Sequence, residues 1–560
     1  MAYKDLLRRK RFSREDSPSN SGSRAESCSR TPMREDDSDY EEDTEEDFQK
    51  IQDLLNARLL QVESEKDNNQ DKSLGDAKQA AAVALNKSRI QSESTTVNEI
   101  IHSLTQPRTE VSTLSRELLL AQLYKLIVSK PLVVYNEENQ GSANFVDEEK
   151  VQKLLDIFTS GTYRTETEFL YLYRSVISII LSNIEDFSIF VTSEFLSHLQ
   201  ALVVDPASGT ISNQNKAHII SGFVSLTLIL CNGSSSFGID DRVLWLMEIA
   251  EGYSVSAVEL KKKVESGERD HSTLFDKNED KRLVAEAYDT VSAEISVATA
   301  ALHGMACLLT LIPRGDFLNE IVENLMFKLV PIVDNDENRE ISKAAGRVVA
   351  LIYESYTYGE DDDEEDHEYN SNSPYYEQEQ IFSIFERLTN LSSKRVAKKD
   401  KKEFNSVFRT ILQTLEVYVD SEKRESIYKK SPAGVELITT IMDSTYIRLS
   451  KYKSLPINSW YLYARLRNLK WCFSFGLHSQ LVANETIRDC LVEPESEYGD
   501  SNEFKIDEGL LSEEQAYVEY VNDMMDYKHI VDDKKRSAKI RKERAAKLAE
   551  TLQDLEITEK

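Results

Sequence analysis

The stretch I-V-D-N-D-E-N-R-E-I-S-K-A-A-G-R-V-V-A-L-I, residues 332–352, decides the fold. It indicates the end of one helix, an acidic turn and the start of a second helix whose apolar positions recur at the spacing of one helical face. Small side chains at Ala344, Ala345 and Gly346 favour close contact with a neighbouring helix. The apolar face comprises Ile341, Ala344, Ala345, Val348, Val349 and Ile352.

The same plan of helix, turn and helix occurs twice more towards the N-terminus. Residues 202–228 repeat it, and residues 101–127 give a fainter copy. Asp205 and Asp334 are 129 residues apart, close to three repeats of the roughly 40–47 residues found in HEAT and armadillo arrays. Sustained strand alternation and hairpin-turn signals are nearly absent from the sequence. We therefore predict an all-α fold, an armadillo/HEAT-like α-solenoid followed by a smaller helical C-terminal region; an irregular helical bundle is the alternative.

Changes in composition divide the chain into segments. Residues 1–48 are acidic and Ser-rich, with too few apolar side chains to offset the entropy lost on ordering. Residues 360–368 are almost purely acidic, and Pro374 follows them. The predicted segments are a disordered tail (1–48), a partly disordered helical lead-in (49–96), the α-solenoid (97–359), an acidic linker (360–375), the C-terminal helical region (376–492), a second acidic linker (493–510) and charged C-terminal helices (511–560).

Three basic clusters stand out against a net charge of −30. Two are candidate sites for nucleic acid or a protein partner, because dense positive charge attracts anionic surfaces. The third is a candidate nuclear-import signal. For each, a merely solvated helix or tail is the alternative. The first comprises Lys394, Arg395, Lys398, Lys399, Lys401 and Lys402; the second Lys534, Lys535, Arg536, Lys539, Arg541, Lys542, Arg544 and Lys547; the third Arg8, Arg9, Lys10 and Arg11.

Directly after the first cluster comes F-N-S-V-F-R-T-I-L-Q-T-L-E, residues 404–416, which resembles the C-terminal signature of the interferon-related developmental regulator family. Residues 470–490, K-W-C-F-S-F-G-L-H-S-Q-L-V-A-N-E-T-I-R-D-C, resemble that family's closing segment through Gly476, His478, Leu481, Asn484 and Glu485. With the order of the earlier helices, the similarity spans roughly 99–492. The resemblance implies a non-enzymatic regulator of transcription or translation. Independently of it, residues 404–416 predict a helix that buries Phe404, Val407, Phe408, Ile411, Leu412 and Leu415 on one face.

Sequence signatures of catalysis and metal binding are missing. There is no H-E-x-x-H, C-x-x-C, G-x-S-x-G, P-loop or dinucleotide fingerprint. We therefore predict that the protein is not an enzyme and has no catalytic, cofactor-binding or metal site. Five scattered cysteines favour a reducing compartment, and no signal peptide or membrane span is evident. The expected location is cytoplasmic, nuclear or both, with no membrane contact and no small-molecule substrate.

Two functions remain open from the sequence, and a third, a transport adaptor of the armadillo type, is disfavoured because no ladder of regularly spaced Asn and Trp residues is visible. The first is a translational regulator, in which the solenoid binds protein partners or a ribosomal surface and the basic segments contact RNA. The second is a nuclear transcriptional co-regulator that bridges transcription factors and chromatin-modifying complexes. The solenoid and the basic tetrad at residues 8–11 serve either hypothesis.

Overall fold

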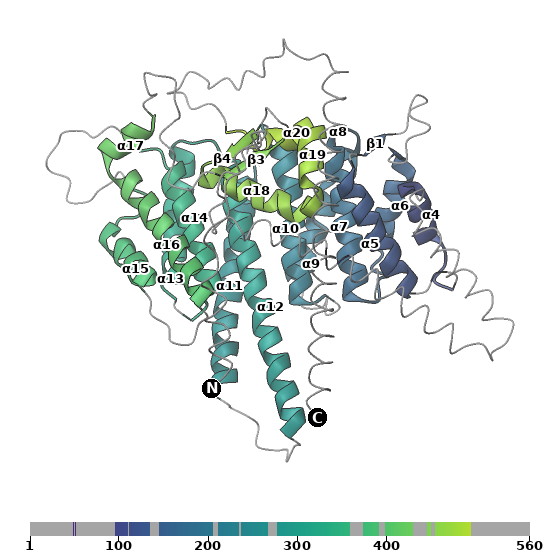
Figure 1. The fold of residues 1–560 in the computed structure, drawn as a ribbon, viewed down its shortest axis with the longest axis horizontal. Helices are drawn as coiled ribbons and strands as arrows, with labels where there is room; N and C mark the ends of the chain where they lie inside the picture. Colours follow the sequence, from purple (N-terminus) through teal and green to yellow (C-terminus); the bar gives the residue numbers. More distant parts are fainter. Residues whose placement is uncertain are drawn as a thin grey trace, which may run out of the picture. The chain divides into compact units, whose positions relative to one another are not determined.

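Paired helices make up most of the chain in the computed structural model (Figure 1). The structure describes residues 49 and 51 and residues 96–493, with gaps at 110, 112, 131, 135–144, 205–210, 234–236, 267–276, 336, 359–372, 391–397, 429–444 and 450–453. The pairs are α4 (Val97–Thr105) with α5 (Thr113–Ser129), α6 (Glu148–Thr159) with α7 (Glu166–Ser182), α9 (Ser193–Val204) with α10 (Asn213–Cys231), α11 (Ile239–Ser266) with α12 (Lys277–Leu309), α13 (Asp316–Val333) with α14 (Arg339–Ser355), and α15 (Gln378–Asn390) with α16 (Lys398–Val419).

The second helix of each pair contacts the second helix of the next pair. Helices α5, α7, α10, α12, α14 and α16 therefore form one continuous row, which we call the inner row. The first helix of each pair packs against its partner in that row. Stacking of this kind is the packing of an α-solenoid, so the predicted all-α fold is confirmed. The central helix α7 is buried over most of its length, as its apolar sequence predicts.

Shorter elements connect and close the array. They are α8 (Ile184–Phe187), η3 (Ser188–Phe190), α17 (Ser421–Tyr428), α18 (Trp460–Phe473), η5 (Ser474–Gly476), α19 (Leu477–Ala483) and α20 (Glu485–Asp489). Two short strand pairs complete the described chain. β1 (Val133–Val134) runs parallel to β2 (Phe145–Val146), and β3 (Thr445–Arg448) runs antiparallel to β4 (Ser454–Ile457), with Thr445 opposite Ile457.

Residues 332–352 fold as predicted. Helix α13 ends at Val333, and α14 begins at Arg339. Every residue of the predicted apolar face of α14 is buried, with at most 3% of its surface exposed. A Cβ atom on Gly346 would lie 3.0 Å from Ile411 and 3.2 Å from Phe385, so the glycine lets α15 and α16 pack close to α14.

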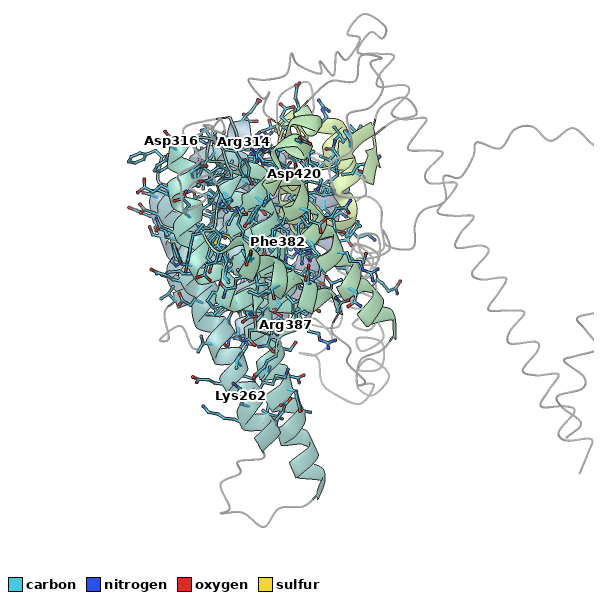
Figure 2. All side chains as sticks on the ribbon, turned by 90° about the vertical axis from the view of Figure 1, so that its left-hand side faces the viewer. Lys262, Arg314, Asp316, Phe382, Arg387 and Asp420 are labelled. Atoms are coloured by element: carbon cyan, nitrogen blue, oxygen red, sulfur yellow. The ribbon has the colours of Figure 1, made fainter. Side chains whose placement is uncertain are left out.

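The acidic turn between α13 and α14 connects neighbouring helix pairs. Asp334 forms an ion pair with Arg387 of α15, and Glu337 lies 3.1 Å from the Nζ atom of Lys262 on α11. Figure 2 labels Arg387 and Lys262. These side chains are exposed, so each pair contributes at most about 1 kcal/mol to stability. They link the turn to α15 on one side and to α11 on the other.

The repeats between Asp205 and Asp334 are longer than the roughly 40–47 residues predicted from the sequence. Only the pair α11/α12 lies between α9/α10 and α13/α14. Asp205, after α9, and Asp334, after α13, are therefore two repeats apart rather than three. The prediction was wrong because α11 has 28 residues and α12 has 33, more than twice the roughly 11–12 of an average helix. The far end of this hairpin extends past the other helices (Figures 1 and 2).

One section of α12 has the length and apolar composition of a membrane-spanning helix. It comprises residues 285–309, and 67% of its most apolar window is buried inside the array. Helix α12 packs against α10, α11, α14 and α18. Its apolar character is therefore that of a core helix.

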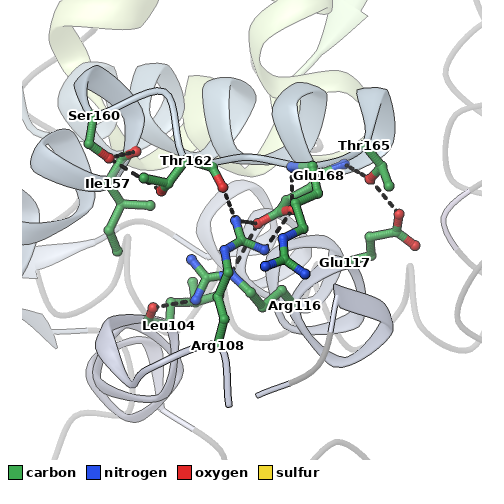
Figure 3. A network of polar contacts seen from close by, with 10 residues as sticks. Leu104, Arg108, Arg116, Glu117, Ile157, Ser160, Thr162, Thr165 and Glu168 are labelled. Carbon is green, nitrogen blue, oxygen red and sulfur yellow. Dashed lines mark hydrogen bonds and ion pairs between the residues drawn. The ribbon is translucent and has the colours of Figure 1, made fainter. Parts of the chain in front are cut away.

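A buried ion-pair network joins the first two helix pairs (Figure 3). Glu168, in the first turn of α7, accepts hydrogen bonds from Arg116 Nε at 3.0 Å and Arg108 at 2.8 Å. Arg116 also donates to the carbonyl of Leu104 at the end of α4. Burial by itself raises the pKa of Glu168, but hydrogen bonds from Arg108, the Arg164 amide and Arg116 bring it below its usual value. Glu168 is therefore a structural carboxylate that fixes two repeats together.

The row of helices continues beyond residues 359–372. Helix α16 packs on α14 through Phe408 and Ile411, which touch Gly346. The predicted segment boundaries remain predictions. The tail 1–48, most of the lead-in 49–96, most of the linker 360–375, residues 494–510 and the charged helices of 511–560 lie outside the described residues.

Candidate functional site

The face of the inner row is covered by residues 460–491, which we call the closing segment. Its first helix, α18, contacts α7, α10, α12 and α14 in turn, and α19 contacts α5 (Figure 1). Helix α18 begins at Trp460 because the side chain of Ser459 accepts the backbone N–H of Leu462. Most of α18 is buried. The surface that a solenoid offers to partners along this row is therefore occupied by the chain itself.

Arg465 fastens the middle of α18 to the ends of two inner helices. Its guanidinium donates to the carbonyl and the hydroxyl of Thr310, just after α12, at 3.0 and 2.8 Å. It also donates to Asn232 at the end of α10, at 2.8 Å, and to the Cys490 carbonyl at 3.2 Å. Helix C-termini carry unpaired carbonyls and partial negative charge, so a buried cation is stabilised there.

Glu354 holds the N-terminus of α18. Its carboxylate oxygens accept the backbone N–H groups of Trp460 and Tyr461, both at 2.9 Å. The side chain lies at the end of α14 and is 3% exposed. Burial, followed by the nearby charge of Glu493, raises the pKa of Glu354 to about 7, although the two N–H groups act in the opposite direction. This carboxyl group therefore titrates near neutral pH.

The C-terminus of α18 is satisfied by side chains of α5 and α7. Arg174 donates to the Trp471 carbonyl at 2.7 Å. Tyr124 and Ser178 both donate to the Cys472 carbonyl at 3.0 Å. The carbonyl groups of Trp471 and Cys472 at the end of α18 are thus hydrogen-bonded to side chains of α5 and α7. These bonds fix the position of the C-terminus of α18 on the array.

The five residues that carry the family resemblance in the closing segment have different roles. Gly476 lies so close to α5 that a Cβ atom would be 1.9 Å from the Val128 carbonyl oxygen. Leu481 is fully buried. Asn484 accepts the Ile487 amide and donates to the Ser182 carbonyl at 2.8 Å. His478 and Glu485 are exposed. Three of these residues therefore dock the segment, and two remain at the surface.

The basic cluster before residue 404 lies at the start of α16. Lys398, Lys399, Lys401 and Lys402 belong to the first turns of this helix, while Lys394 and Arg395 lie outside the described residues. Further along α16, Phe408, Ile411 and Leu415 are fully buried, and Val407 and Leu412 are half-buried. These five residues of the predicted apolar face attach α16 to the array, while the side chain of Phe404 lies outside the described residues. The clusters at residues 8–11 and 534–547 lie outside the described residues.

Two aromatic rings are exposed on neighbouring helix pairs, one in α13 and one just before α15. Phe327 of α13 is 56% exposed and Tyr376, just before α15, is 53% exposed. Their ring centroids are 5.6 Å apart. Adjacent exposed aromatic side chains of this kind are common in protein interfaces. We call Phe327 and Tyr376 the aromatic patch.

Three of the four cysteines in the described part of the chain have unreactive thiols. Cys307, Cys472 and Cys490 are buried, and burial raises the pKa of each thiol to about 12. Such thiols remain protonated at neutral pH and are poor nucleophiles. Within the described ranges, no group of three or more His, Cys, Asp or Glu side chains is placed to hold a metal ion.

Sequence reasoning missed the anchoring residues Arg465 and Glu354. A signal for Arg465 was present, because an arginine inside the apolar helix W-Y-L-Y-A-R-L needs a partner when buried. Glu354 carried no comparable signal, since its partners lie more than 100 residues further along the chain.

Residues 272–416 match the model of a family described as Interferon-related developmental regulator (IFRD). The match covers about a quarter of the chain, from α12 to α16. It includes the predicted signature at residues 404–416 and confirms the resemblance. The closing segment lies beyond the matched residues.

Proposed function

Because the chain belongs to the interferon-related developmental regulator family, a family of regulatory proteins, we propose that it is a non-catalytic scaffold that regulates translation. In this proposal the array binds a protein or ribosomal surface, and the basic segments contact RNA. The observation that carries it is the placement of the α16 cluster. Lys398, Lys399, Lys401 and Lys402 occupy the first turns of a helix whose other half is anchored to α14.

That anchoring supports RNA contact for a physical reason. A basic segment tethered only by a flexible chain loses conformational entropy when it binds, whereas a helix already fixed to a folded array loses less. Lysines in this position supply the charge that displaces counterions from phosphates. The basic residues at 534–547 are proposed to add further contacts.

Sedimentation of tagged full-length protein through sucrose gradients tests the proposal. We expect co-migration with ribosomes or subunits that diminishes when Lys398, Lys399, Lys401 and Lys402 are replaced by Gln. The matched control replaces Lys153, Lys261, Lys262 and Lys328 by Gln, which removes the same charge from elsewhere on the array. An equal loss of co-migration in both variants would mean that ribosome association depends only on the total charge of the protein. No co-migration in the wild type would contradict the translational role.

The salt dependence of RNA binding gives a second measure. Each lost phosphate contact should reduce the log–log salt slope for single-stranded RNA by about 0.7. The α16 variant and a deletion of residues 530–560 should each have a shallower slope than the wild type. Unchanged slopes and affinities would identify both segments as solvated chain.

The aromatic patch favours a second candidate function, that of a nuclear co-regulator bridging transcription factors and chromatin-modifying complexes. Phe327 and Tyr376 expose apolar surface suited to a protein partner rather than to a phosphate backbone. The basic tetrad at residues 8–11 is the proposed import signal. Nuclear accumulation that depends on this tetrad, together with RNase-insensitive migration away from ribosomes, would favour this function over the first.

A further inference from the structure

The first helices of the last three pairs expose large apolar side chains on adjoining surfaces. Helices α11, α13 and α15 follow one another along the array (Figure 1). The Nζ atom of Lys328 on α13 lies 3.6 Å from Glu251 on α11, and the aromatic patch joins α13 to the residue just before α15. We call the exposed side of these three helices, together with Tyr376, the first-helix face. Its large apolar residues are Leu244, Val255, Phe317, Phe327 and Tyr376, each at least 44% exposed.

The first-helix face is strongly acidic. Ten carboxylate side chains of α11, α13 and α15 are exposed, against four exposed basic side chains. Two of those basic residues, Lys328 and Arg387, form ion pairs with Glu251 and Asp334. Such a surface repels phosphate groups and attracts a basic segment. The exposed acidic residues are Asp241, Glu248, Glu251, Glu259, Glu265, Asp316, Glu320, Glu323, Glu379 and Glu386, and the basic ones are Lys262, Lys263, Lys328 and Arg387.

Apolar side chains among acidic ones favour a ligand that is both basic and partly apolar. Residues 534–555 of this chain have that composition. Eight of the fourteen residues from 534 to 547 are basic, and only Glu543 among them is acidic. Leu548, Leu552 and Leu555 follow at spacings of four and three residues, which places them on one face of the predicted helix. The segment therefore complements the first-helix face in charge and in apolar surface.

We propose that residues 534–555 dock on the first-helix face of the same chain, with their leucines against the aromatic patch and their basic side chains beside its carboxylates. The connection is long enough. Residues 494–533 separate the segment from the last described residue, and about 40 residues span up to about 130 Å when extended. Helix α11, with 28 residues, is only about 42 Å long.

The docking is shallow and reversible, because it joins exposed charges and partly exposed rings. Its loss should therefore change the accessibility of residues 534–555 rather than the melting temperature of the array. Docked basic side chains are withheld from other anionic surfaces. That the surface withheld is RNA rests on the proposed function, whereas the docking itself does not and is measured without RNA.

Trypsin cleaves after lysine and arginine, so its initial rate of cleavage within residues 534–547 of the full-length protein reports how often the segment is undocked. Mass spectrometry of the fragments gives that rate. Replacing Glu248, Glu320 and Glu379 by Gln, one from each helix of the face, should accelerate this cleavage about tenfold, the combined effect of three exposed charge interactions. The matched control replaces the exposed Glu148, Glu185 and Glu194 of α6, α8 and α9 by Gln and should leave the rate unchanged. Equal rates in the wild type and the face variant, or equal acceleration by both variants, would overturn the proposal.

Two further arms locate the docked segment. Phe327→Ala combined with Tyr376→Ala should also accelerate cleavage, and an unchanged rate would remove the aromatic patch from the site. Carbodiimide joins lysine amines to carboxylates that touch them, so it should link lysines of residues 534–547 to glutamates of the first-helix face. Links confined to the acidic residues 360–368 would place the segment elsewhere and overturn the assignment. Links or protection that disappear on dilution would show docking on a second copy of the chain and contradict docking within one chain.

Discussion

At residue 476 the packing of the closing segment leaves no room for a side chain. A Cβ atom would overlap the backbone oxygen of Val128, which cannot rotate away as a flexible side chain can. We expect Gly476→Ala to lower the free energy of unfolding by about 2–3 kcal/mol, the usual cost of overpacking. The measurement is urea denaturation followed by circular dichroism.

Gly252 provides the matched control for that substitution. It lies within α11, and a Cβ atom there would meet nothing within 4 Å. Gly252→Ala should stabilise the protein by about 0.5–1 kcal/mol, because alanine loses less backbone entropy in a helix. A neutral Gly476→Ala would mean that the closing segment is not docked as closely as described.

Glu354 makes stability depend on pH. Its pKa is about 7 in the folded protein, above the ordinary value of 4.5, so the folded state binds the proton more tightly than the unfolded state. The resulting contribution to stability is fully present below pH 4.5 and is lost as the pH rises to about 7. Glu354→Gln should remove this contribution. The measured quantity is the difference in unfolding free energy between wild type and variant across this range, and a difference independent of pH would contradict the assignment.

On the scale of single elements, α14 and α16 are held by their apolar faces. Val348 is fully buried on α14, so Val348→Asp places an unpaired charge in the core and should cost several kcal/mol. Gln413→Asp adds the same charge at an exposed position of α16 and should be nearly neutral. Thermal unfolding followed by circular dichroism compares the two variants. An unchanged melting temperature for Val348→Asp would contradict the burial of this face.

The two halves of α16 should respond differently to substitution. Phe408→Ala removes a fully buried ring and should destabilise the protein by about 3 kcal/mol. Replacing Lys398, Lys399, Lys401 and Lys402 by Gln should change stability little, because we expect these lysines to face solvent, where charges contribute little to folding. Denaturant titrations of both variants give the comparison. Marked destabilisation by the Gln replacements would mean that the cluster takes part in packing.

For the whole molecule, the closing segment should be required for the array to fold. Truncation after residue 453 removes β4 and α18–α20 and exposes the apolar face of the inner row that α18 covers. It also leaves Tyr124, Ser178 and Thr310 without their partners from α18. We expect an insoluble product or one that unfolds without a cooperative transition, as judged by expression and calorimetry.

A second truncation distinguishes this effect from simple shortening. Deleting residues 530–560 removes the predicted basic tail but leaves every described contact in place. Its melting temperature should stay within a degree or two of the wild type, because no described packing is lost. Comparable damage from both truncations would mean that the closing segment has no special role.

The sequence by itself determined which stretches are helices and which faces of them are buried. The face from Ile341 to Ile352 and the buried residues of α16 follow from spacings of three and four residues, which are local properties of a helix. The sequence also determined the solenoid class, because successive helix–turn–helix units have nowhere to bury their faces except against one another. The number of repeats was misjudged, since spacing along the chain does not reveal that α11 and α12 are unusually long.

Only the tertiary structure decided what covers the inner row and what converges where α18 crosses it. Arg465 meets Thr310 and Asn232 across 155 and 233 residues of sequence, and Tyr124 meets Cys472 across 348. His303, Arg347 and Arg467 come together in the same way, from α12, α14 and α18, which are distant along the chain. Periodicity shows that a helix has an apolar face but not which helix it meets. That choice depends on shape and hydrogen-bonding complementarity between whole faces, which exists only once the chain has folded.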